Sequence, residues 1–199
     1  MQTKQEMFLD LMGQRSIQFI IPVYQRSYAW TEKQCDELWR DINRAGRVGA
    51  VHFIGTVLYK AEDQREGAQS RQLALIDGQQ RIATLTLLLV SFRSYLTGHQ
   101  GALAEMDAEQ LNERYLHAYD GIENACKLIL SRLDRDTMIA VINETALPET
   151  PASRVLENLD FFKKKMAEDD FDTQVFWAGM QRLMLIDAEL GDEDHAQYV

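Results

Sequence analysis

The chain has 199 residues, 46% hydrophobic and 26% charged, which is typical of a folded globular protein and excludes a disordered one. Its net charge is -10, so the chain lacks the excess of basic residues that is typical of a protein that wraps nucleic acid. No apolar run approaches the roughly 20 residues that span a bilayer, and no signal peptide is recognisable, so we expect a cytoplasmic protein without membrane contact.

The first half of the chain has the pattern of a mixed sheet with helices. Patterning and capping residues predict the following elements in order: a short helix ending near Gly13, a strand from Ile17 to Pro22, a helix capped by Thr31 and closed near Gly46, a strand over 51–61, a polar connection over 62–71, a strand over 72–77, and a buried helix over 81–95 that stops at Gly98.

The second half is predicted to be mainly helical. The expected elements are an amphipathic segment over 104–122, a short strand over 126–131, a helix over 134–144 capped by Asp134, a linker over 146–153, helices over 153–168 and 173–181, a strand over 182–190, and a helix that has barely begun over 191–199, where the chain stops as a fragment would. The sequence thus predicts an α+β protein with one domain over 1–100 and a mainly helical extension over 101–199.

The stretch LALIDGQQRIATLTLLL, residues 73–89, places a polar motif between a strand and a helix. Gly78 permits a left-handed turn, and the first amides of the following helix are free donors at the positive end of its dipole. Arg81 adds a guanidinium suited to phosphate. Asp77 can hold a metal ion or orient Arg81. The alternative is an ordinary turn, in which Asp77 caps the helix and the two glutamines are solvated.

A second stretch, IPVYQRSYAW, carries the same Gln-Arg pair just beyond a strand end. Here Gln25 and Arg26 are surrounded by Tyr24, Tyr28 and Trp30. A basic residue among aromatic rings is typical of a site that binds phosphate and stacks a base. The alternative is that the rings belong to the core and Arg26 pairs with an acid.

Other chemistry finds less support. Cys35 and Cys126 stand far apart with no Cys-x-x-Cys pattern, and the four histidines share no metal or triad spacing, so we place no disulfide and no zinc. There is no Walker A or dinucleotide motif. Residues 1–100 carry 12 Lys and Arg against 10 Asp and Glu, whereas residues 101–199 carry 9 against 21, so an anionic ligand is expected to meet the first half.

The stretches IPVYQRSYAW, HFIGTVLY and LIDGQQRIATLTLLL, in this order and spacing, resemble the N-terminal domain of the GmrSD-type restriction endonuclease family. KLILSRLDRD extends the resemblance more faintly over most of the chain. The resemblance implies a ParB/sulfiredoxin-like fold, in which a small mixed sheet and helices precede a mainly helical part. It also implies a role in bacterial defence, where nucleotide hydrolysis is coupled to restriction of modified DNA.

Carried over by position, the family motif implies that Asp77, Gln80 and Arg81 are catalytic, and that Tyr24, Gln25, Arg26, Gly78 and Gln79 bind the nucleotide. An NTP and a divalent metal ion are the implied cofactors. A His-Asn-His type nuclease domain or subunit and modified DNA are the implied partners, because no His-Asn-His site is recognisable in this sequence. Gln79 stands where sulfiredoxin has its reactive cysteine, which excludes sulfinic-acid reduction, and the chain stops where a Phe-Glu-Thr-Leu-Asn-like motif of the family would begin.

Two functions therefore remain open, beside the possibility that the truncated chain folds as an inactive scaffold. The first is an NTP-hydrolysing regulatory domain of a modification-dependent, type IV-like restriction system. The second is a DNA-sensing or protein-docking module in which the same residues bind backbone phosphate and hydrolyse nothing.

Overall fold

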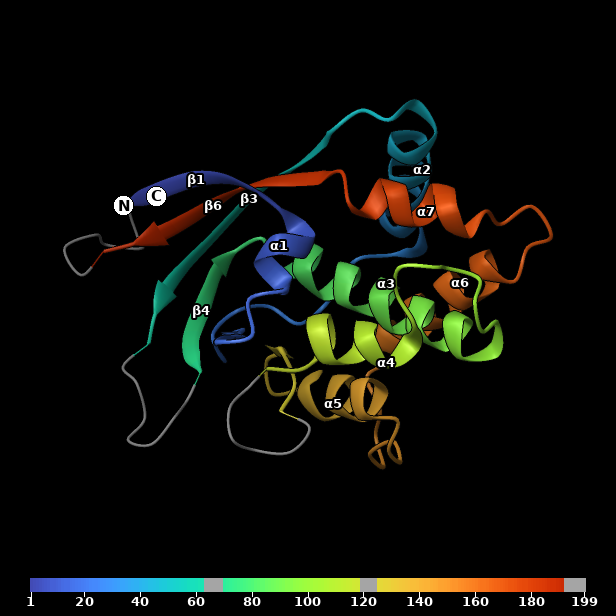
Figure 1. The fold of residues 1–199 in the computed structure, drawn as a ribbon. Helices are drawn as coiled ribbons and strands as arrows, with labels where there is room; N and C mark the ends of the chain where they lie inside the picture. Colours follow the sequence, from blue (N-terminus) through green and yellow to red (C-terminus); the bar gives the residue numbers. More distant parts are fainter. Residues whose placement is uncertain (63–69, 119–124, 192–199) are drawn as a thin grey trace.

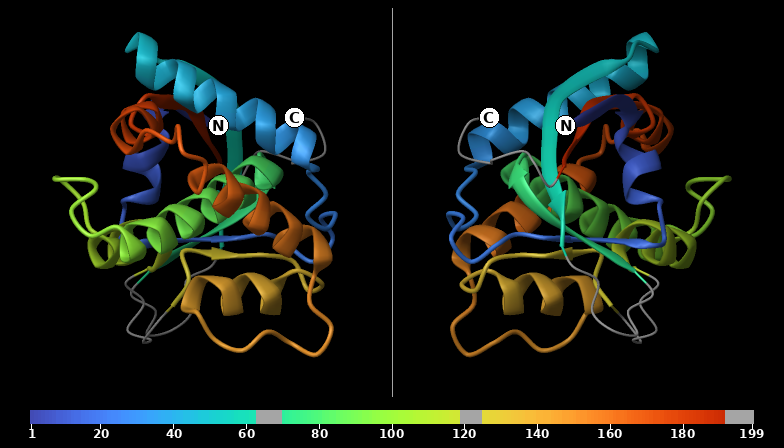
Figure 2. Two further views of the ribbon diagram at one scale, coloured as in Figure 1. Left: turned by 90° about the vertical axis from the view of Figure 1, so that its right-hand side faces the viewer. Right: turned by 90° about the vertical axis from the view of Figure 1, so that its left-hand side faces the viewer.

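A computed structural model describes residues 1–62, 70–118 and 125–191. Within them, a six-stranded mixed sheet carries helices mainly on one face (Figures 1 and 2). The α+β class is therefore confirmed.

The sheet has the strand order β1-β6-β3-β4-β2-β5. Its strands are β1 (Gln2–Met7), β2 (Ile17–Ile20), β3 (His52–Ala61), β4 (Arg71–Asp77), β5 (Leu128–Ile129) and β6 (Leu183–Leu190). β3 and β4 are antiparallel, as are β1 and β6, while β3 and β6 are parallel. β2 is parallel to both β4 and β5, so the carboxyl ends of these three strands meet at one edge of the sheet.

The helices pack against this sheet and against one another. They are α1 (Phe8–Met12), α2 (Glu32–Val48), α3 (Gln79–Gly98), α4 (Ala108–Leu111), α5 (Arg135–Asn143), α6 (Ser153–Met166) and α7 (Thr173–Met180), with a π-helical turn at Asn112–Leu116. α3 lies at the centre, with 15 of its 20 residues buried. Its Phe92 ring lies 4.9 Å from that of Phe176, so α3 and α7 share one aromatic core.

The core joins both halves of the sequence. β5 and β6, both from beyond residue 100, are strands of the same sheet as β2, β3 and β4. α6 packs on α3, and α7 packs on α2. Residues 1–100 thus contain only part of the sheet, and the division at residue 100 stays a prediction.

Several predicted boundaries were wrong. β1 was not predicted at all, because its residues QTKQEM are mostly exposed and lack an apolar alternation. The helix after Thr31 continues through Gly46 to Val48 and ends at Gly49, whose φ is 73°. Gly46 is instead a site of close packing, since a Cβ there would overlap the carbonyl oxygen of Val175.

The second half shows two further differences. A single amphipathic segment was expected over 104–122. In the described part of this range, the helical residues are those of α4 and of the π-helical turn that follows it. Asp134 precedes α5 as predicted, but its side chain makes no capping hydrogen bond to that helix. Most of the predicted 62–71 connection and the helix expected over 191–199 lie outside the described residues.

Candidate functional site

The motif at residues 77–81 forms a strand, a left-handed turn and a helix start, as predicted. β4 ends at Asp77, Gly78 has φ 87°, and α3 begins at Gln79. A Cβ at Gly78 would lie 3.0 Å from the carbonyl oxygen of Thr56, so both conformation and space require glycine here. No side chain caps α3, and its first helical hydrogen bond runs from the Ile82 amide to the Gly78 carbonyl. The amides before Ile82 therefore remain donors for an anion.

Arg81 extends from this helix start toward β3 and is half-buried. Its Nη1 donates to the carbonyl oxygen of Thr56 at 3.3 Å, and its guanidinium lies against Gly55. Burial lowers the pKa of Arg81, and the negative charge of Asp77 partly opposes that shift. Among the described residues Arg81 has no ion-pair partner, so a desolvated cation stands beside the free amides of α3.

The glutamines of the motif are buried at 7% exposure each, so the alternative that they are solvated is wrong. Gln79 donates from Nε2 to Oε1 of Gln25 at 2.9 Å, and Gln25 donates from its own Nε2 to the Ile76 carbonyl at 3.1 Å. The two Gln-Arg stretches are therefore joined through their glutamines.

Gln80 holds the same loop at a second place. Its Oε1 accepts a hydrogen bond from the Ala29 amide at 2.7 Å, and its Nε2 donates to the Ser27 carbonyl at 3.1 Å. Both ends of the side-chain amide are thus occupied by loop backbone, so in this conformation Gln80 positions the loop after β2.

The side chains of that loop differ in their burial. Tyr28 is buried, and its hydroxyl hydrogen-bonds with Thr84 Oγ1 at 2.7 Å and accepts from Asn158 Nδ2 at 2.8 Å. Burial raises the pKa of Tyr28, which keeps it protonated. Tyr24 is 77% exposed and Arg26 is exposed, so these two side chains face solvent beside the turn. Tyr28 thus fits the core alternative, whereas Tyr24 and Arg26 remain accessible to a ligand.

Two residues that sequence reasoning missed complete the site. Asp134 Oδ2 accepts the Tyr28 amide at 2.7 Å, and burial raises the pKa of Asp134 although this hydrogen bond lowers it in part. Gly55 has φ 101° and no Cβ, which leaves room for the guanidinium of Arg81. A glycine inside a strand of β-branched residues was the available signal for Gly55, since it often marks a close approach. No sequence signal linked Asp134 to a residue 106 positions away.

The structure therefore brings together the turn residues Gly78, Gln79, Gln80 and Arg81 with Gln25. Asp77 lies at the same turn with its side chain exposed and does not cap α3. The described residues contain no group of three metal-ligating side chains, so a divalent ion here would need oxygens from its ligand beside Asp77.

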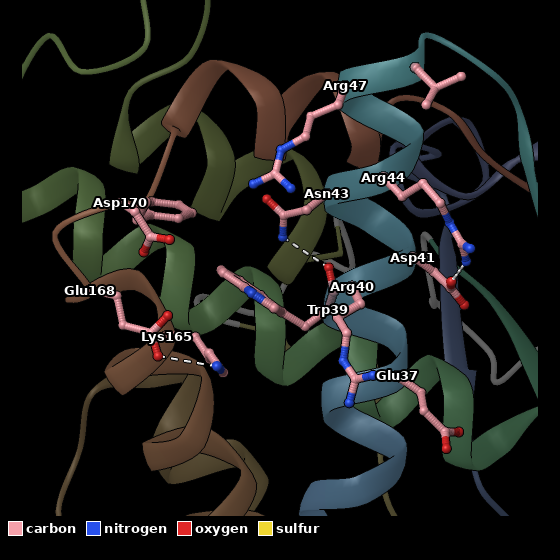
Figure 3. A pocket seen from close by; sticks show the side chains of 12 residues that line it. Glu37, Trp39, Arg40, Asp41, Asn43, Arg44, Arg47, Lys165, Glu168 and Asp170 are labelled. Atoms are coloured by element: carbon pink, nitrogen blue, oxygen red, sulfur yellow. Dashed lines mark hydrogen bonds and ion pairs between the residues drawn. The ribbon is translucent and has the colours of Figure 1, made fainter.

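A separate groove of about 730 Å³ lies between α2 and the chain that joins α6 to α7 (Figure 3). Trp39 and Phe171 are among its lining residues, with charged residues of both signs around them. Several of these charges are already paired, as in Lys165 with Glu168 at 3.1 Å and Arg44 with Asp41. None of the residues predicted for the nucleotide site lines this groove.

The described chain is an α+β protein in which β4, a left-handed turn and α3 follow one another, and a half-buried arginine stands at the start of α3. The family model for the GmrSD restriction endonuclease N-terminal domain matches residues 8–197, and the chain belongs to this family. It is therefore a component of a restriction system. A search of curated proteins gave no match. No helix in the described ranges has the length and apolar character needed to cross a membrane.

Proposed function

We propose that the chain is a nucleotide-binding, NTP-hydrolysing regulatory domain of a modification-dependent restriction system in anti-phage defence. The observation that carries this proposal is the unpaired, half-buried guanidinium of Arg81 beside the free amides that follow Gly78. Together they offer positive charge and aligned donors in a partly desolvated place, which is where electrostatic stabilisation of phosphate is strongest.

The proposed ligand arrangement follows the accessible groups. The phosphates lie at the turn, in contact with the α3 amides and Arg81, while the exposed ring of Tyr24 stacks on the base and Arg26 meets a second phosphate. Gln25 and Gln79 fix the loop against the turn by their mutual hydrogen bond. Asp77 would hold a divalent ion, which would supply charge neutralisation at the phosphates.

Hydrolysis adds water to the terminal phosphorus and breaks the bond to the bridging oxygen, giving a nucleoside diphosphate, inorganic phosphate and a proton. The amides of Gln79 and Gln80 are not general bases. The motif therefore contributes by positioning the reacting groups and by the positive charge of Arg81. A change of the Gln80 hydrogen bonds to Ser27 and Ala29 would free its amide to orient the attacking water. The nuclease activity of the system would then reside in a His-Asn-His type domain or subunit, with modified DNA as the signal.

The test is binding and turnover of ATP and GTP with Mg²⁺ by the full chain and by Arg81→Gln. We expect the variant to bind roughly 10- to 100-fold more weakly, because a charge-assisted hydrogen bond contributes about 1.5–3 kcal/mol. Arg154→Gln, at a partly exposed arginine on α6 paired with Glu157, is the matched control and should bind like the wild type. Equal nucleotide affinity in the wild type and Arg81→Gln would exclude this site.

The engaged amide of Gln80 also favours a second function, a module that binds phosphate without hydrolysing it. Saturable stabilisation by NTP with no release of phosphate, with or without modified DNA, would select this second function.

A further inference from the structure

The loop after β5 lies beside the loop after β2 at the carboxyl edge of the parallel strands (Figure 2). The two loops are joined at both ends. At the strand ends, the Ile21 amide donates to the Ile129 carbonyl at 2.8 Å, and farther along the Tyr28 amide donates to Asp134 at 2.7 Å. These hydrogen bonds hold both loops to the same edge of the sheet.

Between these anchors the loops expose apolar side chains that the core does not use. Val23, Tyr24 and Leu133 are 74%, 77% and 77% exposed. Leu133 is held in a turn, because the amides of both Asp134 and Arg135 donate to the Ser131 carbonyl. Three large apolar side chains exposed on two joined loops are unusual for a surface with no partner.

Three arginines accompany these apolar side chains: Arg26, Arg132 and Arg135 are all exposed. Among the described residues none of the three forms an ion pair, in contrast to the exposed Arg40, which pairs with Asp36. The exposed carboxylates of Asp77 and Asp136 belong to the same edge by their sequence positions. We call the six side chains of Val23, Tyr24, Arg26, Arg132, Leu133 and Arg135 the strand-end surface.

We propose that the strand-end surface binds a nucleic-acid strand that presents unstacked bases. Guanidinium groups bind backbone phosphates, and exposed aromatic and apolar side chains pack on base faces that a closed duplex hides. Arg132 and Arg135 neutralise the backbone while Leu133 and Val23 contact a base next to the Tyr24 ring. The acidic remainder of the chain confines the contact to this edge.

This inference rests on the proposed function, because the polymer that a restriction system must engage is DNA. Tyr24 and Arg26 belong to both proposed contacts. Arg81 and the turn serve only the nucleotide, whereas Arg132, Leu133 and Arg135 serve only the strand. The two can therefore be measured separately on the same protein.

The test is fluorescence anisotropy of a labelled single-stranded DNA of roughly 12 nucleotides and of its duplex, with the full chain between roughly 50 and 200 mM salt. We expect the single strand to bind more tightly than the duplex. The double variant Arg132→Gln, Arg135→Gln should bind the single strand roughly tenfold more weakly at low salt, with the salt slope reduced by about 1.4, since each phosphate contact in a single strand contributes about 0.7.

Two further variants separate charge from apolar contact. Leu133→Asn should weaken single-strand binding and leave the salt slope unchanged. Arg47→Gln removes an exposed arginine beside the groove of Figure 3 and should leave both quantities at the wild-type value. Unchanged circular dichroism and thermal melting of each variant establish that the fold is retained.

Weaker strand binding in the double variant, with ATP and GTP affinity retained, supports the proposal. Three results would overturn it: no single-strand binding by the wild type at low salt, the same affinity in the double variant and the wild type, or a loss of nucleotide affinity in place of strand affinity. Failure of Arg81→Gln to change nucleotide binding would overturn the proposed function alone.

Discussion

Gly55 lies so close to the guanidinium of Arg81 that a Cβ at residue 55 would come within 2.9 Å of Nη2. A glycine with positive φ in the middle of β3 is therefore tied to an arginine at the start of α3. The pairing keeps Arg81 against the Thr56 carbonyl and half-buried.

Gly55→Ala should displace Arg81 from this position and weaken nucleotide binding. An alanine at this positive φ also strains the backbone, which lowers the free energy of unfolding by about 1–2 kcal/mol. Gly49→Ala is the control, because Gly49 also has positive φ, at 73°, but a Cβ there would meet nothing within 4 Å. Thermal melting should show a loss of stability in both variants, and titration with ATP or GTP should show weaker binding only in Gly55→Ala. Equal nucleotide affinity in the two variants would argue against the role of Gly55.

Gln80→Ala should release the loop after β2, because the Ala29 amide and the Ser27 carbonyl both lose their partner. We expect a loss of about 1–3 kcal/mol in stability. The sharper measurement is hydrogen exchange at the Ala29 amide, which should become faster. Gln72→Ala removes a glutamine that donates to Gln18 within the sheet and should leave exchange at Ala29 unchanged. Slow exchange at Ala29 in both variants would show that Gln80 does not hold the loop.

Asp134→Asn tests the link between the loops after β2 and β5. Burial raises the pKa of Asp134 above its ordinary value of 3.8, so the folded state holds the proton more tightly than the unfolded state. Stability contributed by this group is therefore present at low pH and declines as pH rises through the folded pKa. Asn keeps an oxygen that accepts the Tyr28 amide without a buried charge, so the variant should lose this decline and equal or exceed the wild type at neutral pH. Urea unfolding of both proteins from pH 3 to 7, at roughly equal steps, measures how the free energy of unfolding depends on pH. A wild type that loses no stability relative to Asp134→Asn over this range would contradict the assignment.

Local patterns in the sequence were enough to predict the strand, turn and helix at residues 72–98. Gly78 separates a short apolar run, LALI, from a helix-length run, and the structure has the left-handed turn that this glycine permits. The burial of Gln79 and Gln80 was not predictable, because their partners lie 51 to 54 residues earlier in the loop after β2. A glutamine next to a turn is usually solvated, and only the tertiary approach of that loop makes these two structural.

Asp134 likewise has a partner that is distant in the sequence. Its position before a helix predicted a cap, since an aspartate there usually accepts from the first helical turn. The carboxylate instead accepts the Tyr28 amide, which the parallel pairing of β2 with β5 brings to the same edge. β5 has only two residues, so no local pattern predicts this pairing.

Lys127 is fully buried next to β5, where its Nζ donates to the carbonyl oxygens of Gln14 and Ile17, the latter at 3.2 Å. Burial, with a smaller contribution from the charge of Arg15, lowers the pKa of Lys127 from 10.5 to about 8. Between these values the unfolded state binds more protons than the folded state, so this group makes the protein more stable as pH rises from about 8 to 10.5.

Lys127→Met removes this group, so the wild type should gain stability relative to the variant over that range, by on the order of 2–3 kcal/mol. Comparing the two proteins by urea unfolding at each pH cancels the titration of the other groups, among them Cys35 and Cys126, whose pKa values burial raises to about 11. Lys163→Met, at an exposed position on α6, is the control and should follow the wild-type curve. Parallel curves for the wild type and Lys127→Met would show that Lys127 keeps its proton in the folded protein as readily as in the unfolded one.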